Sequence, residues 1–285
     1  NCEIPVIVRL HGPWFLNGSF DERTKDAAYL RRVRREGEGI AAAAGVTAPS
    51  QDVIDQVRKF YGLALPDAVS IPIPMVPPPE DQRWRLDACD RNRILFVGRF
   101  DLHKGGDLVI DAFRKVLDER PHARLSFAGA DSGIPVEGQS LQKLQPYIEA
   151  RLPGALADGR IEWLGVQTPE QLNAQRRRAL VTVIASRYET FGNTLREAMI
   201  TGCPVVSSDI GGLKEILDNE KNSLRFEAGD AGDLAQKLVW TLDNPERAAS
   251  LGRQALEDCS QRYAPSRIAE ETLAYYHKVL QRRRQ

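Results

Sequence analysis

Two glutamates eight residues apart, Glu189 and Glu197, form the pair of side chains with the most specific chemical potential in this sequence. The apolar run at 180–185 predicts a buried parallel strand, and a helical pattern begins near Asn193. One carboxylate is therefore expected in the strand-to-helix loop and the other in the first helical turns. Residues 191–194 would present backbone N–H groups at the helix start, where an anion is favoured. Amides for phosphate or sugar oxygens, beside carboxylates for hydroxyls, indicate a sugar nucleotide as ligand.

Three further motifs accompany this pair, at residues 98–105 (GRFDLHKG), 202–206 (GCPVV) and 211–215 (GGLKE). Together they resemble the G-R-x4-K-G, E-x7-E, G-x-P-V-V and G-G-x-x-E signatures of retaining glycosyltransferases with the GT-B fold, specifically glycosyltransferase family 4 (group 1). The resemblance runs from about residue 94 to residue 263, with the motifs in the right order. A lone E-x7-E pair is a weak signal, whereas four ordered motifs on alternating strands and helices are specific.

The resemblance implies a reaction in which a hexose moves from a nucleoside diphosphate sugar, UDP- or GDP-linked, to an acceptor hydroxyl. The implied acceptor is a glycan, a lipid-linked molecule or a small molecule, and the anomeric configuration is retained. No cofactor besides the donor is implied. No D-x-D triplet occurs in the sequence, so nothing in it indicates a metal ion that bridges the diphosphate.

The resemblance also implies roles for individual residues. Arg99 and Lys104 would clamp the donor diphosphate, because arginine offers a planar fork to phosphate oxygens and lysine a point charge. Negative charge develops there as the glycosidic bond breaks, so this contact would be electrostatic catalysis. Glu197 would accept hydrogen bonds from the ribose, and Glu189 would lie beside the transferred sugar. His11 resembles a histidine placed beside that sugar from the acceptor domain.

Each role has a simpler alternative. The two cations can be surface charges that start an exposed helix, Glu197 can merely complement the helix dipole, and Glu189 can be a solvated loop carboxylate. A single histidine such as His11 is more often structural. The predicted catalytic residues are Glu189, Arg99, Lys104 and His11. The predicted donor-binding residues are Arg99, Lys104, Val166, Phe191, Gly192, Asn193, Thr194 and Glu197.

Strand and helix patterns alternate through most of the chain, which predicts an α/β protein of GT-B type with a doubly wound parallel sheet. Strands are expected at 4–10, 46–50, 69–73, 94–98, 124–129, 161–164, 180–186, 204–208 and 223–226. Helices are expected at 26–44, 51–61, 107–117, from about 193, and at 266–284. A proline-rich stretch at 74–90 reads as a linker.

Three parts follow from this pattern. Residues 1–78 are expected to form a partial N-terminal Rossmann-like acceptor domain, and residues 79–262 a complete C-terminal donor-binding domain. Residues 263–285 form a last helix that the resemblance predicts to cross back to the first domain. The first part lacks the opening strand and glycine-rich loop of the family, so we expect an incomplete acceptor domain. The alternative function is therefore a nucleotide-sugar binding module without turnover.

Composition excludes several other classes. The 285 residues carry 39 Lys+Arg and 39 Asp+Glu, so no overall field recruits nucleic acid. The 4 cysteines lie far apart, without metal-ligand spacing, as expected in a reducing cytoplasm. No G-x-G-x-x-G follows a predicted strand and no G-x4-G-K-[ST] occurs, which argues against dinucleotide oxidoreductases and P-loop enzymes. The basic runs at 31–35 and 282–284 are typical of solvated faces, with contact to anionic lipid at the cytoplasmic membrane face as the alternative.

Overall fold

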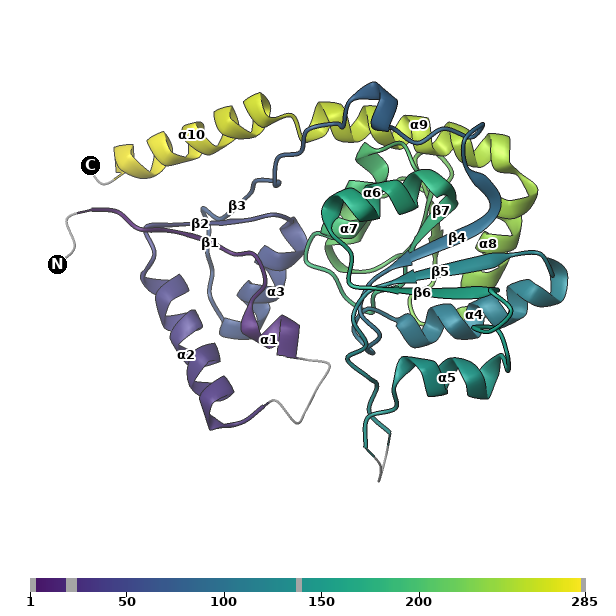
Figure 1. The fold of residues 1–285 in the computed structure, drawn as a ribbon. Coiled ribbons are helices and arrows are strands. Elements are labelled where there is room, and N and C mark those ends of the chain that lie inside the picture. Colours follow the sequence, from purple (N-terminus) through teal and green to yellow (C-terminus); the bar gives the residue numbers. More distant parts are fainter. Residues whose placement is uncertain (1–3, 19–24, 137–139, 283–285) are drawn as a thin grey trace. The chain divides into compact units, whose positions relative to one another are not determined.

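The computed structural model describes residues 4–18, 25–136 and 140–282. The chain divides into two compact units (Figure 1). The first unit consists of Asn1–Met75 together with Arg262–Gln285, and the second unit is Val76–Gln261. Each unit has its own parallel sheet, and each is described by itself.

The second unit is built on a six-stranded parallel sheet with the order β6-β5-β4-β7-β8-β9. Its strands are β4 (Asp90–Val97), β5 (Arg124–Ala128), β6 (Ile161–Gly165), β7 (Ala179–Ile184), β8 (Val205–Ser208) and β9 (Leu224–Phe226). The helices are α4 (Gly106–Glu119), α5 (Leu144–Arg151), α6 (Pro169–Arg178), α7 (Asn193–Ile200), α8 (Ala231–Asp243) and α9 (Pro245–Arg262), with 3-10 turns η3 (Glu80–Gln82) and η4 (Gly211–Glu215).

Apolar strands explain why the centre of this sheet is buried on both faces. All six residues of β7 are buried, as expected for a central parallel strand. On one face, α4, α5 and α8 contribute to the main core, for example through Phe113, Ile148 and Leu238. On the other face, Leu172 of α6 packs beside a smaller cluster that includes Leu95. The result is the helix–sheet–helix layering expected from the sequence.

The strand order of this sheet reverses between β4 and β7. From β4 the chain proceeds outward to β5 and β6, and it then returns to place β7 on the other side of β4. Open α/β sheets bind ligands at the carboxyl ends of the strands beside such a reversal. The loops that follow β4 and β7 are therefore the segments where a ligand site is expected.

The first unit contains a three-stranded parallel sheet in the order β1-β2-β3. It comprises β1 (Ile7–Arg9), α1 (Trp14–Asn17), α2 (Ala27–Ala42), β2 (Gly45–Ala48), α3 (Gln51–Tyr61), β3 (Val69–Ser70) and α10 (Pro265–Arg282). The final helix α10 packs into this unit, because Ile268, Tyr275 and Val279 form one cluster with Ile71. The hydroxyl of Tyr275 accepts a hydrogen bond of 2.8 Å from the Val46 amide of β2.

The strand boundaries differ from the sequence prediction by three or more residues in β1, β3 and β4, and by one or two residues in the other strands. β1 covers Ile7–Arg9 within the expected 4–10, and β3 covers Val69–Ser70 within the expected 69–73. β3 ends just before Ile71, which precedes a proline, and Pro72 has no N–H to continue a ladder. β4 begins at Asp90, before the expected residue 94, since its polar first residues still pair with β7 and β5.

Candidate active site

Two loops meet at the reversal of the sheet. We call residues 98–105, which follow β4, the clamp loop, and residues 186–192, which follow β7, the glutamate loop. Asp101 organises the clamp loop: its Oδ2 accepts a 2.6 Å hydrogen bond from Arg99 Nε, and its Oδ1 accepts one of 2.7 Å from the Lys104 backbone amide. One mostly buried carboxylate thus fixes both predicted clamp residues. The sequence motifs alone did not assign a role to Asp101.

Gly105 brings the clamp loop against the end of β7. It precedes α4 with φ of 70°, in the left-handed region that favours glycine. A Cβ atom at this position would lie 2.0 Å from the backbone oxygen of Ala185. Only glycine therefore allows α4 to start so close to the glutamate loop.

Lys104 and Glu189 form an ion pair between the two loops. Their side chains are 24% and 13% exposed, respectively, and Ser186 Oγ donates a second hydrogen bond of 2.8 Å to Glu189 Oε1. Lys104 is therefore not a freely solvated surface cation, and Glu189 is not a solvated loop carboxylate. The structure brings together two residues that are 85 positions apart in the sequence.

His103 of the clamp loop also contacts the glutamate loop. Its Nε2 is 2.9 Å from the Tyr188 carbonyl oxygen, so the neutral tautomer that carries a proton on Nε2 can donate to it. Burial, together with the neighbouring Lys104 charge, lowers the pKa of His103. The ring is therefore kept neutral near pH 7, and it adds no charge to the site.

Glu197 is held by a buried arginine. It lies on α7, and its Oε2 accepts a 2.7 Å hydrogen bond from Arg176 Nη2 of α6. Arg176 is almost fully buried, whereas the Glu197 side chain is half-exposed. Glu197 can thus accept further hydrogen bonds from a ligand while Arg176 fixes its position. Arg176 carried no signal in the sequence that set it apart from Arg177 and Arg178.

The start of α7 is shaped by Gly192, which has φ of 64°. This φ lies in the left-handed region that favours glycine, and a Cβ at Gly192 would in addition lie 2.3 Å from Leu213 Cδ2 of η4. Asn193 is exposed, and Thr194 is partly exposed. The Phe191 ring is buried beneath the Arg196 guanidinium, at 4.2 Å from the ring centre. The turn before α7 is therefore held in one conformation, with Asn193 at the surface where a ligand can reach the start of the helix.

Two predicted residues, Val166 and His11, belong to neither the two loops nor α7. Val166 follows β6, two strands away from β4, and is 76% exposed. Its strand end is tied to the sheet by the 2.8 Å hydrogen bond from Gly129 to the Gly165 oxygen. His11 belongs to the first unit, where it is exposed just after β1. Partial burial and the nearby Arg9 charge lower the pKa of His11.

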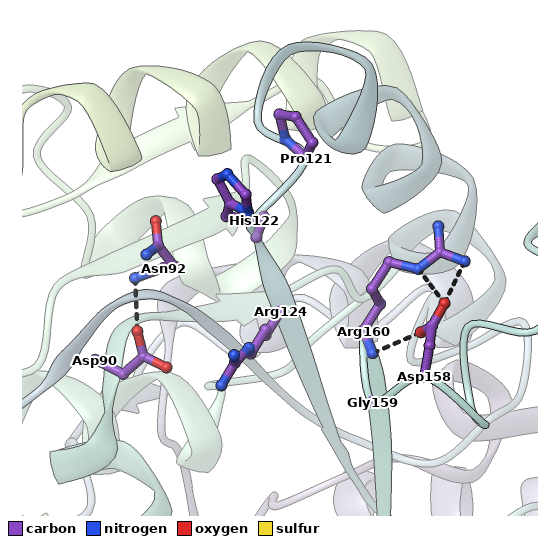
Figure 2. A pocket seen from close by; sticks show the side chains of 9 residues that line it. Asp90, Asn92, Pro121, His122, Arg124, Asp158, Gly159 and Arg160 are labelled. Carbon is purple, nitrogen blue, oxygen red and sulfur yellow. Dashed lines mark hydrogen bonds and ion pairs between the residues drawn. The ribbon is translucent and has the colours of Figure 1, made fainter.

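A polar cavity lies at the other edge of the same sheet (Figure 2). It has a volume of about 660 Å³, and its lining comes from the amino ends of β4, β5 and β6, including Asn92, His122 and Arg124. Asp158 and Arg160 are already paired there, as Figure 2 shows. Parallel sheets bind ligands at the opposite, carboxyl edge, so this cavity does not mark the site of the motifs.

Metal-binding clusters and membrane-spanning helices are both absent from the described part of the chain. Within residues 4–18, 25–136 and 140–282, no group of three or more His, Cys, Asp or Glu side chains is arranged to hold a metal ion. In the same ranges, no helix is both long and apolar enough to cross a membrane.

The sequence is similar to those of several curated glycosyltransferases. A glycosyltransferase of Methanocaldococcus jannaschii, itself uncharacterized, is 31% identical over 187 residues, which cover 66% of this chain and 45% of that protein. D-inositol 3-phosphate glycosyltransferase 1 of Catenulispora acidiphila is 27% identical and is matched over 98% of this chain and 68% of its own length. Many of the curated relatives are matched over only about half of their length.

A solved structure and a family model complete the comparison. The structure of HepE from Anabaena in complex with UDP has a TM-score of 0.71 at 19% identity, over 96% of this chain and 72% of HepE. This likeness supports the GT-B type of α/β fold. The family model described as "Glycosyl transferases group 1" matches residues 80–258, which is most of the second unit. The protein therefore belongs to the group 1 glycosyl transferases.

Proposed function

We propose that this protein transfers a hexose from a nucleoside diphosphate sugar, UDP- or GDP-linked, to a hydroxyl of a glycan, lipid-linked or small-molecule acceptor with retention of configuration. One observation carries the proposal: the ion pair that joins Lys104 of the clamp loop to Glu189 of the glutamate loop, at the reversal of the sheet. Cations for a diphosphate and a carboxylate for a sugar are thereby adjacent. The UDP bound in the similar fold of HepE supports a nucleotide donor.

In this proposal the donor diphosphate lies across the clamp loop and the start of α7. Asp101 accepts from Nε of Arg99, which leaves the two Nη groups of Arg99 for phosphate oxygens. Lys104 exchanges its Glu189 partner for phosphate. The N–H groups of residues 191–194 contact phosphate or sugar oxygens, Glu197 accepts from the ribose hydroxyls, and Val166 contacts the donor.

We propose that retention comes from a displacement on one face of the sugar. The bond between the anomeric carbon and the diphosphate oxygen breaks, and its electron pair leaves with the nucleoside diphosphate. The acceptor hydroxyl attacks from the same face, so the leaving oxygen is the nearest base and takes the hydroxyl proton. Arg99 and Lys104 stabilise the charge on the leaving group. Glu189 either holds a sugar hydroxyl or stabilises positive charge at the anomeric carbon.

We further propose a cytoplasmic location, with acceptor binding and lipid contact outside the donor site. The acceptor binds to the first unit, and nucleic acid is not a partner. Peripheral contact with anionic lipid would use the exposed arginines of α2: Arg31, Arg32, Arg34 and Arg35. Arg282 is less suited, because it pairs with Asp67, and Arg283 and Arg284 lie outside the described residues.

Binding and transfer assays test this proposal separately. Calorimetry with UDP and GDP should give saturable binding that persists in EDTA, because side chains and amides supply the positive charge. Labelled nucleotide sugars with an acceptor panel should give a glycoside whose anomeric configuration, read by NMR, matches that of the donor. Inversion of configuration, or a strict need for Mg²⁺ or Mn²⁺, would contradict the proposal.

The alternative function is a nucleotide-sugar binding module without turnover. It is favoured by the small sheet of the first unit, where the described residues form three short strands. The same two assays separate the proposals, since a binding module would bind the nucleoside diphosphate and release no labelled sugar to any acceptor. Transfer to any acceptor of the panel excludes the binding module.

A further inference from the structure

Arg187 links the two loops of the candidate active site. It lies in the glutamate loop, two residues before Glu189, and its Nη1 donates a 2.6 Å hydrogen bond to the Leu102 carbonyl of the clamp loop. Its backbone amide donates a second bond, of 2.8 Å, to the carbonyl of His103. Consecutive carbonyls of the clamp loop are thus held by one residue of the other loop.

Asp107 fixes the orientation of the Arg187 guanidinium. It lies in the first turn of α4, and its two oxygens accept from Nη1 at 2.9 Å and from Nη2 at 2.7 Å. Two parallel bonds between a planar fork and a carboxylate fix direction as well as distance. The side chains are 29% and 12% exposed, so water competes little for these bonds. The hydrogen bond to Asp107 also raises the pKa of Arg187.

The charges show that Arg187 is suited to hold loops and not to bind phosphate. Asp107 neutralises it locally, and both of its terminal nitrogens are already engaged with protein oxygens. The ion pair of Lys104 and Glu189 also joins the loops, but Lys104 must leave Glu189 to contact a diphosphate. In the bound state the Arg187 contacts therefore remain as the main connection, beside the contact of His103 with Tyr188.

We propose that Arg187 and Asp107 are a positioning pair that keeps the clamp loop in register with the glutamate loop, so that Lys104 faces the diphosphate while Glu189 faces the sugar. This inference rests on the proposed function. It assigns Arg187 and Asp107 to donor recognition through the loops that they hold, without contact to the donor itself.

The test measures UDP and uridine affinity by calorimetry for the wild type, Arg187→Lys and Asp107→Asn. Arg187→Lys keeps the charge but loses the fork, and we expect about tenfold weaker UDP binding, equivalent to about 1.4 kcal/mol, with uridine affinity unchanged. Asp107→Asn should weaken UDP binding by a similar factor. The matched control is Asp111→Asn, one helical turn further along α4. Asp111 also pairs with an arginine, Arg151, and the side chains of Arg151 and Asp111 are 34% and 42% exposed, respectively. That control should bind UDP as the wild type does.

Two further readouts separate positioning from a direct phosphate contact and from a purely structural role. If Arg187 contacted phosphate directly, Asp107→Asn would leave its charge uncompensated and strengthen UDP binding, which is the opposite sign. If the pair were merely structural, both variants would unfold at lower temperature while their folded fraction bound UDP normally. In the Lys104→Met background, Arg187→Lys should cost less than about twofold, because the pair acts through Lys104.

The outcomes are distinguishable from failure of the proposed function. Wild-type protein that binds neither UDP nor GDP would overturn the proposed function and this inference together. Wild-type binding with Arg187→Lys and Asp107→Asn unchanged would overturn this inference alone. Tighter UDP binding by Asp107→Asn, or an equal loss in the Lys104→Met background, would overturn it as well.

Discussion

The ion pair between Lys104 and Glu189 predicts that neutralising these two residues changes diphosphate affinity in opposite directions. Without a ligand, Glu189 occupies the ammonium group that a diphosphate needs, and its own charge repels that ligand. We therefore expect Glu189→Gln to bind UDP more tightly than the wild type. Lys104→Met should bind UDP more weakly, because it loses the phosphate contact and leaves the Glu189 charge behind.

The burial of the pair sets the magnitude. With exposures of 24% and 13%, these side chains lie between a surface pair, worth about 0.2–1 kcal/mol, and a sheltered charged hydrogen bond, worth about 1.5–3 kcal/mol. Glu189 retains the Ser186 hydrogen bond whether or not Lys104 is present, which reduces the competition. We expect about 1 kcal/mol in favour of UDP binding for Glu189→Gln, or about fivefold tighter binding. For Lys104→Met we expect a loss of about 2 kcal/mol, or about thirtyfold.

Calorimetric titration with UDP, with uridine as the reference ligand, measures both effects. Glu246→Gln is the control for loss of a paired glutamate, because Glu246 forms a more exposed ion pair with Arg91 at the amino end of β4, away from the two loops. Hexosyl transfer by Glu189→Gln should nevertheless fall by at least about a hundredfold, since tighter ground-state binding does not replace the lost carboxylate beside the sugar. If Glu189→Gln weakened UDP binding as much as Lys104→Met, the glutamate would instead hold Lys104 in place for phosphate, and the competition argument would be wrong.

Three further predictions concern other parts of the site. Arg99→Ala should weaken UDP binding by about 10- to 30-fold and leave uridine binding unchanged by calorimetry, whereas equal losses for both ligands would exclude a phosphate contact. Gly105→Ala should lower the free energy of unfolding by about 2–4 kcal/mol in urea titrations, because the new Cβ meets the Ala185 oxygen. The control is Gly154→Ala, which also has a positive φ, of 76°, but has no atom within 4 Å of the new Cβ. It should lower the free energy of unfolding by only about 1 kcal/mol. The pKa of His103 is lower in the folded protein than in the unfolded chain, so the unfolded chain takes up the His103 proton first as the pH falls. The free energy of unfolding should therefore decrease as the pH drops below about 6.5. Between pH 8 and pH 5.5, the melting temperature of His103→Gln should fall less than that of the wild type. An equal fall in both proteins would mean that His103 does not contribute to the pH dependence.

The fold could be predicted from the sequence where local signals agreed with packing. Helix α3 has the predicted bounds, 51–61, because Ser50 caps its first turn with a 3.4 Å hydrogen bond to the Val53 amide and Gly62 ends it in a left-handed conformation. The polar start of β4 gave no such signal. Arg93 lies in a strand because its side chain donates to Ser126 on the neighbouring strand β5 and to Glu162 on β6, the strand beyond it. That reason exists only after the strands have paired.

The candidate site could be predicted only in part, for a related reason. Motif residues such as Arg99 and Glu189 follow predicted strands, so their loops were identifiable. Their partners depend on which strands are neighbours, and nothing local in the sequence shows that β7 lies beside β4. Arg187 is 80 positions from Asp107, and the sequence therefore assigned it no role. Arg176 likewise belongs to a run of three arginines, and only packing shows that it is the one buried under Glu197.

The balance of charge at the two loops decides how a diphosphate can be held there. The charged side chains that join the clamp loop, the glutamate loop and the start of α4 are three cations and three carboxylates: Arg99, Lys104, Arg187, Asp101, Asp107 and Glu189. Their formal charges cancel, and the neutral ring of His103 adds nothing. A diphosphate therefore meets no excess formal charge from these six side chains, so it must be held at short range, by the Nη groups of Arg99, by the N–H groups at the start of α7 and by exchange of partners at Lys104. Lys104 is suited to that exchange, because its partner Glu189 keeps a second donor in Ser186, whereas Arg187 is held at both nitrogens and stays in place.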